Sequence, residues 1–315
     1  MKDLRIVFMG TPDFAVGVLK SLVESGAHIV GVITATDKPA GRGRKLRASA
    51  VKQYSEEQGL RILQPSNLKK EEFLRELKSL EANLQIVVAF RMLPKVVWAM
   101  PEFGTFNLHA SLLPEYRGAA PINWAVMNGE KKTGVTTFFI DEKIDTGAII
   151  AKKEVEIDER ETAGSLHDKL MEAGSELVLE TVRLIAEGNV ETTIQPTSEE
   201  LKEAPKLNND NTKIDWTRTS AVIDAHIRGL DPYPGAWCYL VNNSEELKVK
   251  IFRCGFSIES HDLTPGMIVT GKKEIKVATR DGFVELLELQ LPGKRKMKSS
   301  DLLNGYSFEV DAKVL

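Results

Sequence analysis

Two polar residues, Asn107 and His109, stand two positions apart in the strand-like segment Gly104–His109. Side chains alternate between the two faces of a strand, so both would lie on one face, near the strand's carboxyl end. Ligands of open α/β sheets bind outside the carboxyl ends of the strands. An amide and an imidazole placed there can both address one carbonyl oxygen. Taken alone, such a pair is more often explained by a hydrogen-bonded structural histidine.

The segments that follow favour a functional site. Residues 110–121 carry two prolines, a glycine, a tyrosine and an arginine. Loops with such restricted geometry beside a strand end commonly line a binding site. Further along, the turn Asp141–Gly147 holds two aspartates, Asp141 and Asp145, and ends in a glycine. An ordinary Asx turn explains this second segment when it is considered by itself.

The elements that would position these residues alternate between strand and helix. Their order predicts a Rossmann-like, mostly parallel sheet flanked by helices. Thr11 is expected to cap the first helix, with Pro12 at its first position and Gly26 at its end. The expected strands are Ile6–Met9, His28–Thr34, Arg61–Gln64, Leu84–Phe90 and Gly104–His109, and the later helices are Val51–Gln58, Glu71–Leu80, Pro94–Met100 and Pro121–Asn128.

The second half of the chain has a different order of expected strands and helices. Val135–Asp141 and Ala148–Ile157 are predicted to be antiparallel additions to the sheet, followed by one long helix, Thr162–Glu187. After a helix near Ser220–Arg228, short strands with turn residues between them predict a smaller C-terminal β-barrel of the OB-like kind. The sequence is therefore divided into a catalytic domain (1–189), a linker (190–206) and a barrel domain (207–315).

Composition limits the class of protein. The 315 residues suffice for about two domains, and 42% of them are hydrophobic. A formal net charge of -3 argues against a protein that coats nucleic acid over its whole surface, but it permits a local basic patch. The N-terminus lacks the pattern of a signal peptide, and no apolar run approaches a membrane span of roughly 20 residues. A cytoplasmic protein without membrane contact is expected.

Two further features bear on metals and nucleic acid. Cys238 and Cys254 lack metal-ligand spacing, so both are predicted to be small buried hydrophobic residues and no metal site is expected. Basic residues gather in two places, in a glycine-rich loop and near the C-terminus, and such runs are either solvated or bind phosphates. These residues are Arg42, Arg44, Lys45 and Arg47, and then Lys294, Arg295 and Lys296.

The combined motifs resemble those of the folate-dependent formyltransferase family. That family's signature is matched here by Asn107 with His109, Ser111–Pro114, Tyr116–Pro121 and Asp141–Gly147. Within the family, the chain most resembles the branch of methionyl-tRNA formyltransferases. The narrower resemblance rests on Phe8–Phe14, Lys38–Leu46, Ile214–Trp216, Asp231–Trp237 and Leu289–Met297, so it spans nearly the whole chain.

The resemblance implies a reaction and a role for each residue. The donor would be 10-formyltetrahydrofolate and the acceptor the α-amine of initiator methionyl-tRNA, as in translation initiation. Asn107 and His109 would stabilise the oxyanion of the tetrahedral intermediate, and Asp145 would orient His109 and help proton transfer, directly or through water. Folate contacts are expected from Phe90, Arg91, Met92, Leu93, Ser111, Leu112, Leu113, Pro114 and Asp141, and tRNA contacts from both basic runs.

Two departures from the family pattern and three alternatives remain. Ala110 replaces a usual glycine, and we expect ordinary torsions there. The segment Phe90–Pro94 is one residue shorter than usual and lacks a glycine, which leaves the pterin contacts open. The chain could also formylate glycinamide ribonucleotide or an amino sugar nucleotide, hydrolyse the folate, or bind RNA without catalysis. We expect a monomer.

Overall fold

The computed structural model describes residues 3–40, 45–196 and 200–315. The chain forms two compact units. Unit 1 comprises Met1–Gly118, Lys132–Glu156 and His167–Glu203, and unit 2 comprises Ala119–Lys131, Ile157–Leu166 and Ala204–Leu315. The second unit thus includes two segments from the first half of the sequence. The division at residues 189 and 207 stays a prediction.

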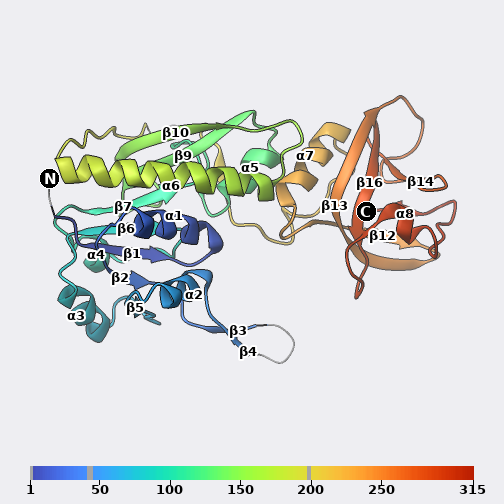
Figure 1. Ribbon diagram of the computed structural model, residues 1–315. Coiled ribbons are helices and arrows are strands. Elements are labelled where there is room, and N and C mark those ends of the chain that lie inside the picture. Colours follow the sequence, from blue (N-terminus) through green and yellow to red (C-terminus); the bar gives the residue numbers. More distant parts are fainter. Residues whose placement is uncertain (1–2, 41–44, 197–199) are drawn as a thin grey trace. The chain divides into compact units, whose positions relative to one another are not determined.

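Unit 1 is built on a seven-stranded sheet with the order β10-β9-β7-β6-β1-β2-β5. The five strands β1, β2, β5, β6 and β7 are parallel, whereas β9 pairs antiparallel with β7 and β10 pairs antiparallel with β9 (Figure 1). Their bounds are β1 Ile6–Gly10, β2 Ile29–Ile33, β5 Ile62–Leu63, β6 Leu84–Val88, β7 Thr105–His109, β9 Lys132–Phe139 and β10 Ile149–Glu156. The predicted mixed sheet is confirmed.

Helices cover both faces of this sheet. The long helix α6 (Ala163–Glu187) lies against β7, where a Cβ on Gly174 would come within 2.7 Å of Leu108 Cδ2. The opposite face packs against α3 (Glu71–Ser79) and α4 (Lys95–Trp98) through an apolar cluster that includes Met9, Val87 and Val97. The remaining helices of this unit are α1 (Asp13–Glu24) and α2 (Ala50–Glu57).

Two local expectations about the N-terminal region differ from the structure. Pro12, and not Thr11, is the N-cap of α1, and no side chain caps that helix. The Pro12 carbonyl accepts the N–H groups of Ala15 and Val16, so the helix begins one residue later than predicted. In addition, the basic loop contains an unpredicted antiparallel hairpin, in which β3 (Lys38–Ala40) pairs with β4 (Lys45–Arg47).

Unit 2 is an antiparallel barrel with helices at its side. Its sheet has the order β14-β15-β16-β13-β12-β18, with β17 beside β16. Backbone hydrogen bonds between the regions of β14 and β18, such as Ile268 N–H to Ala312 O, bring the first and last strands together. The strands are β12 Ala236–Asn242, β13 Glu245–Ile258, β14 Ile268–Thr270, β15 Ile275–Ala278, β16 Gly282–Gln290, β17 Met297–Lys298 and β18 Lys313–Val314. The expected small barrel is confirmed.

Three helices belong to unit 2. Helix α5 (Pro121–Met127) begins with a proline at its first turn, as predicted, and Asn123 donates a hydrogen bond to the Gly229 carbonyl of α7 (Ser220–Leu230). Helix α8 (Ser299–Leu302) precedes the end of the chain. Two short strands, β8 (Arg117–Gly118) and β11 (Glu203–Ala204), stand where the chain changes unit.

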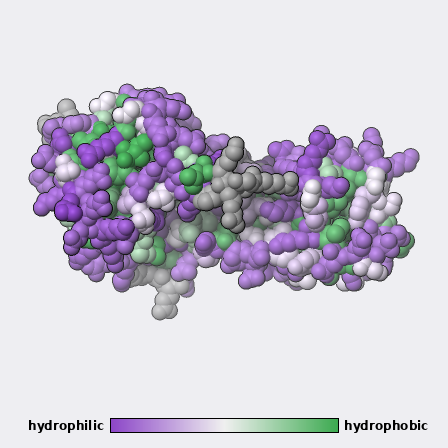
Figure 2. Space-filling view, turned by 90° about the horizontal axis from the view of Figure 1, so that it is seen from below, coloured by the Kyte–Doolittle hydropathy of each residue, from purple (hydrophilic) through white to green (hydrophobic). Residues whose placement is uncertain are grey.

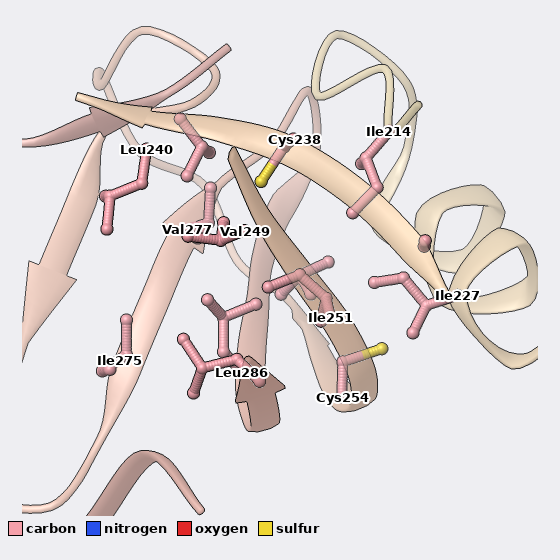
Figure 3. Close-up of a cluster of buried hydrophobic side chains, with 14 of the residues drawn as sticks. Ile214, Ile227, Cys238, Leu240, Val249, Ile251, Cys254, Ile275, Val277 and Leu286 are labelled. Carbon is pink, nitrogen blue, oxygen red and sulfur yellow. The ribbon is translucent and has the colours of Figure 1, made fainter. Parts of the chain in front are cut away.

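The core of unit 2 contains both cysteines. Cys238 from β12 and Cys254 from β13 lie among Ile214, Ile251 and other apolar side chains (Figure 3). Neither cysteine forms a disulfide. Burial raises the pKa of the Cys238 thiol to about 12, and burial followed by the nearby Asp224 carboxylate raises the pKa of Cys254 well above its ordinary value.

These raised pKa values predict unreactive thiols in the folded protein. The thiolate is the nucleophile, and at pH 8 both groups stay protonated. Native protein treated with Ellman's reagent at pH 8 is therefore expected to release no thiolate colour over an hour, whereas unfolding in guanidinium should release two equivalents. A thiol that reacts in the native protein within minutes would contradict the described packing.

Candidate active site

Strand β7 places Asn107 and His109 on one face, as their spacing predicts. Asn107 is opposite Val87 of β6, whose side chain belongs to the apolar cluster under α3 and α4. Leu108, in between, points to the opposite face and meets α6. Asn107 is half-buried and His109 is buried. Both side chains therefore belong to the α4 side of the sheet, at the carboxyl end of β7.

Both nitrogens of the His109 ring face an identified oxygen. Nε2 lies 2.8 Å from the Tyr116 carbonyl, and because a carbonyl only accepts, Nε2 donates its N–H there. Nδ1 lies 3.8 Å from Asp145 Oδ2. The exposed fractions of the two side chains are 7% for His109 and 15% for Asp145. The expected meeting of imidazole and carboxylate is thus present in the structure, although the sequence did not point to the Tyr116 carbonyl.

The distance between Nδ1 and Oδ2 is too long for a direct hydrogen bond. With Nε2 protonated, Nδ1 of a neutral ring has a lone pair, and the Asp145 carboxylate also only accepts. Two acceptors at this separation leave room for a donor from a third group between them. The ring orientation therefore suits proton acceptance better than the oxyanion contact expected for His109 from the sequence.

The turn that carries Asp145 has an unusual backbone. Asp145 has a φ of 54°, in the left-handed region that non-glycine residues rarely adopt. The Gly118 N–H donates to Asp145 Oδ2 at 3.1 Å. A Cβ on Gly147 would lie 1.7 Å from the Phe139 carbonyl oxygen, so only glycine fits where the turn passes the end of β9. Asp141, at the start of the turn, accepts from Lys143 N and Thr146 Oγ1, which makes it an Asx turn.

The loop after His109 is held mainly by buried contacts. Ser111 Oγ donates to the Glu115 carbonyl, and Leu113 packs against Phe138 and Ile149. The Ser111 and Leu113 side chains are completely buried, so neither is exposed for the folate contact that the sequence predicts. Leu112 and Pro114 are half-buried. Ala110 is absent from the described residues with positive φ, in agreement with the expected ordinary torsions there.

A partly apolar surface borders the site on the α4 side. Lys95 of α4 and Glu142 of the turn form an ion pair at 2.6 Å, which brings the turn beside the helix. Around this contact, Met92 and Ile144 are 72% and 58% exposed, and Val96 is also exposed. Figure 2 shows the molecule from below, with green apolar areas interrupting its purple surface. Exposed apolar side chains beside a strand end are typical of a ligand surface.

The other two residues predicted to bind folate in this segment, Phe90 and Arg91, have protein contacts. Phe90 is half-buried against the cluster that contains Leu93, which is itself buried. Arg91 lies over the Phe90 ring at 5.6 Å and donates to the carbonyls of Pro65 and Ser66. Ala89, directly before them, has a φ of 48°. The shortened segment thus turns sharply at the carboxyl end of β6.

The basic residues have different surroundings. Arg42 and Arg44 lie outside the described residues, and Lys45 is described only by its backbone in β4. Arg47 is exposed, as are Lys294 and Arg295. Lys296 is within 2.9 Å of Glu288 and 3.6 Å of Asp231, and it lies over the Phe252 ring. Its charge is already balanced, so Lys296 is the weakest of the predicted phosphate contacts.

Residues 3–40, 45–196 and 200–315 contain neither a metal-binding group nor a membrane-spanning helix. Within these ranges, no three histidine, cysteine, aspartate or glutamate residues are grouped so that they could hold a metal ion. No helix in the described chain combines the length and apolar character needed to cross a membrane.

Comparison with known proteins identifies the family. The formyl transferase family matches residues 4–182, and the formyl transferase C-terminal domain matches residues 206–307. The chain belongs to the formyl transferase family. Relatives named methionyl-tRNA formyltransferase include those of Flavobacterium johnsoniae, 59% identical, and Flavobacterium psychrophilum, 60% identical, each aligned over 100% of both chains. That of Bacteroides fragilis is 54% identical over 97% of this chain and 96% of its own.

Two solved structures share the fold at low sequence identity. WlaRD, a sugar 3N-formyl transferase solved in the presence of dTDP and 5-N-formyl-THF, is 21% identical with a TM-score of 0.65, over 94% of this chain and 100% of that chain. HypX from Aquifex aeolicus, solved with tetrahydrofolic acid, is 20% identical with a TM-score of 0.65, over 96% of this chain and 47% of that chain.

Proposed function

We propose that this formyl transferase transfers the formyl group of 10-formyltetrahydrofolate to the α-amine of initiator methionyl-tRNA. The observation that carries the proposal is the convergence of His109 and Asp145 beside Asn107 at the carboxyl end of β7. Full-length relatives named methionyl-tRNA formyltransferase support the choice of acceptor. Exposed Met92, Val96 and Ile144 support a flat heteroaromatic donor at the bordering surface.

The geometry assigns a different task to each polar side chain. The amine attacks the formyl carbon, a C–N bond forms, and the carbonyl electrons move to oxygen. Asn107 is half-buried and has an amide that can donate N–H to this oxyanion. The proton lost by the amine passes to His109 Nδ1, beside the Asp145 carboxylate. The intermediate then expels N10 of the folate, which takes up a proton.

The Tyr116 carbonyl has a supporting role in this scheme. By accepting from Nε2, it keeps the lone pair of the neutral imidazole on Nδ1, the nitrogen that faces Asp145. Tyr116 itself has a φ of 60°, and its N–H donates to the Lys202 carbonyl at 2.6 Å. The loop after β7 thus fixes the ring tautomer as well as the ring position.

One assay separates this proposal from its alternatives. Purified protein is incubated with 10-formyltetrahydrofolate and, in parallel, methionyl-tRNA, glycinamide ribonucleotide, an amino sugar nucleotide or water alone. Mass spectrometry of the products should show a gain of one formyl group on methionyl-tRNA only. Formylation of a small-molecule amine, or formate release without an acceptor at a comparable rate, would overturn the proposal. Absence of any product would favour an RNA-binding protein without catalysis.

The basic loop gives a separate prediction about the RNA partner. Each phosphate neutralised by a cation contributes about 0.7–0.9 to the log–log slope of affinity against salt. Replacing Arg42 by alanine is expected to raise KM for methionyl-tRNA and to flatten this slope by about that amount. Affinity is measured by filter binding between 50 and 200 mM salt. An unchanged slope would mean that the loop is only solvated.

Two further properties are proposed on chemical grounds. An acceptor that takes part in translation initiation supports action in the cytoplasm. The monomeric state expected from the sequence stays a prediction, which light scattering of the purified protein tests.

A further inference from the structure

A buried glutamine outside the predicted site contacts the turn that carries Asp145. Gln195 follows α6 in a segment expected to be a linker, yet only 5% of its surface is exposed. Thr193, two residues before Gln195, forms an antiparallel bridge with Ile149 at the start of β10. The segment is therefore fixed to the sheet beside the active site, and it brings Gln195 into contact with the turn Asp141–Gly147.

All polar atoms of the Gln195 side chain are engaged within unit 1. Oε1 accepts from Arg117 Nη2 at 2.6 Å and from Nε at 3.2 Å. Nε2 donates to the Asp145 carbonyl at 2.9 Å and to the Gly147 carbonyl at 2.8 Å. A guanidinium only donates and a carbonyl only accepts, so these partners admit one orientation of the amide.

We propose that Gln195 is a positioning residue that holds the Asp145 carboxylate in place beside His109. This inference rests on the proposed function of the Asp145–His109 pair. The two carbonyls bound by Nε2 flank Thr146, so one side chain fixes the backbone on both sides of the residue after Asp145. The left-handed φ of Asp145 is costly for a non-glycine residue and persists where surrounding contacts hold it, as these two hydrogen bonds do.

Arg117 holds the oxygen end of the Gln195 amide. Its guanidinium orients the Gln195 oxygen, and its neighbour Gly118 donates through its backbone to Asp145 Oδ2. The same short stretch includes the Tyr116 carbonyl that accepts from His109. Gln195 therefore links the loop that fixes the imidazole with the turn that supplies the carboxylate. Gln195 binds the backbone carbonyl of Asp145 and not its carboxylate, so it acts through the position of Asp145.

The variant Gln195→Glu tests this positioning role. A glutamate preserves the shape and the contact with Arg117, but it places an oxygen against the carbonyls of Asp145 and Gly147. We expect kcat to fall by roughly 10–100-fold, since misplacing a reacting group by about 1 Å costs about 100-fold. The KM values for folate and methionyl-tRNA are expected to stay within threefold. Gln53→Glu is the matched control, since Gln53 is exposed and donates to the Ala48 carbonyl far from this turn along the chain.

A second readout needs no substrate. The ¹⁵N resonances of the imidazole rings report on the surroundings of each of the five histidines. Gln195→Glu should shift His109 Nδ1 in the same direction as Asp145→Asn, while His167, which pairs with Asp168 on the surface, should keep its resonances. Gln195→Ala checks that loss of the amide suffices without an added charge. A protein that was merely destabilised would show lower thermal stability without this selective shift.

The inference predicts both results together, the loss in kcat and the selective shift of His109. A kcat of Gln195→Glu within threefold of wild type overturns it, as does an unchanged His109 resonance in a folded variant. If the wild-type protein fails to formylate methionyl-tRNA, the proposed function fails, and the resonances still decide whether Gln195 positions Asp145.

Discussion

Replacing Asp145 by asparagine is expected to lower kcat for formyl transfer by ~10²–10⁴-fold, the usual contribution of a positioned acid–base group. The substitution keeps the side-chain volume and an oxygen for the Gly118 N–H. It removes the negative charge that faces His109 Nδ1 at 3.8 Å, and with it the stabilisation of the proton taken from the amine. His109→Ala should cause a loss of similar size. Asn107→Ala should cost ~10²–10³-fold, as for other oxyanion donors.

An exposed pair in the same unit provides the matched control. His167 Nδ1 lies 2.9 Å from Asp168 Oδ1, but the Asp168 side chain is 76% exposed. Asp168→Asn removes the same charge from beside a half-buried histidine outside the site, and its kcat should stay within twofold of wild type. Rates are measured with saturating folate and methionyl-tRNA. Turnover near the wild-type level in any of the three site variants would remove that residue from the scheme.

The largest expected effect on stability comes from Asp224 in unit 2. Asp224 is 1% exposed on α7 and binds two guanidinium groups, Arg160 at 2.8 Å and Arg228 at 2.7 Å. Arg160 also donates to the Cys254 carbonyl, and Arg228 donates to the Glu161 carbonyl. One buried carboxylate thus joins α7, the segment 157–166 and the barrel strand β13. Asp224→Ala leaves the largely covered guanidinium of Arg228 without its carboxylate partner and should lower the free energy of unfolding by about 3–5 kcal/mol.

Urea unfolding followed by circular dichroism measures this loss. Glu274→Ala serves as control, because Glu274 pairs with Lys276 at 3.4 Å on the surface, where an ion pair contributes about 0–1 kcal/mol. If Asp224→Ala and Glu274→Ala destabilise the protein equally, the buried carboxylate does not hold the three segments together. The transition of unit 2 is the relevant one, since both residues belong to it.

Much of the fold follows from patterns within the sequence. Apolar runs such as Leu84–Val88 and the 25-residue amphipathic helix Ala163–Glu187 have the periodicity of their elements, so their existence could be predicted. The hairpin β3–β4 is not predictable from the sequence, because its two strands have three residues each and are too short to show alternation. No local pattern places residues 157–166 in unit 2, because the Arg160–Asp224 contact joins positions 64 residues apart.

In the candidate site, too, local patterns predict some residues and do not predict contacts between distant segments. Alternation along one strand placed Asn107 and His109 on a common face, and the family resemblance supplied Asp145 as the partner. The roles of Gln195 and of the Tyr116 carbonyl could not be predicted. Gln195 comes from a segment without periodicity, and a backbone carbonyl carries no sequence signal. The buried side chains of Ser111 and Leu113 were likewise hidden, because a motif does not tell whether a side chain faces ligand or protein.

In the proposed mechanism, one formyl carbonyl binds between Asn107 and the His109–Asp145 pair. A crystal structure of the protein with the stable analogue 5-formyltetrahydrofolate tests it most directly. We expect the pterin against Met92 and Ile144, and the formyl group within about 4 Å of His109, with its oxygen in hydrogen-bond reach of the Asn107 amide, about 2.7–3.2 Å. A folate bound elsewhere, or a formyl group on the far side of the sheet from His109, would contradict the account.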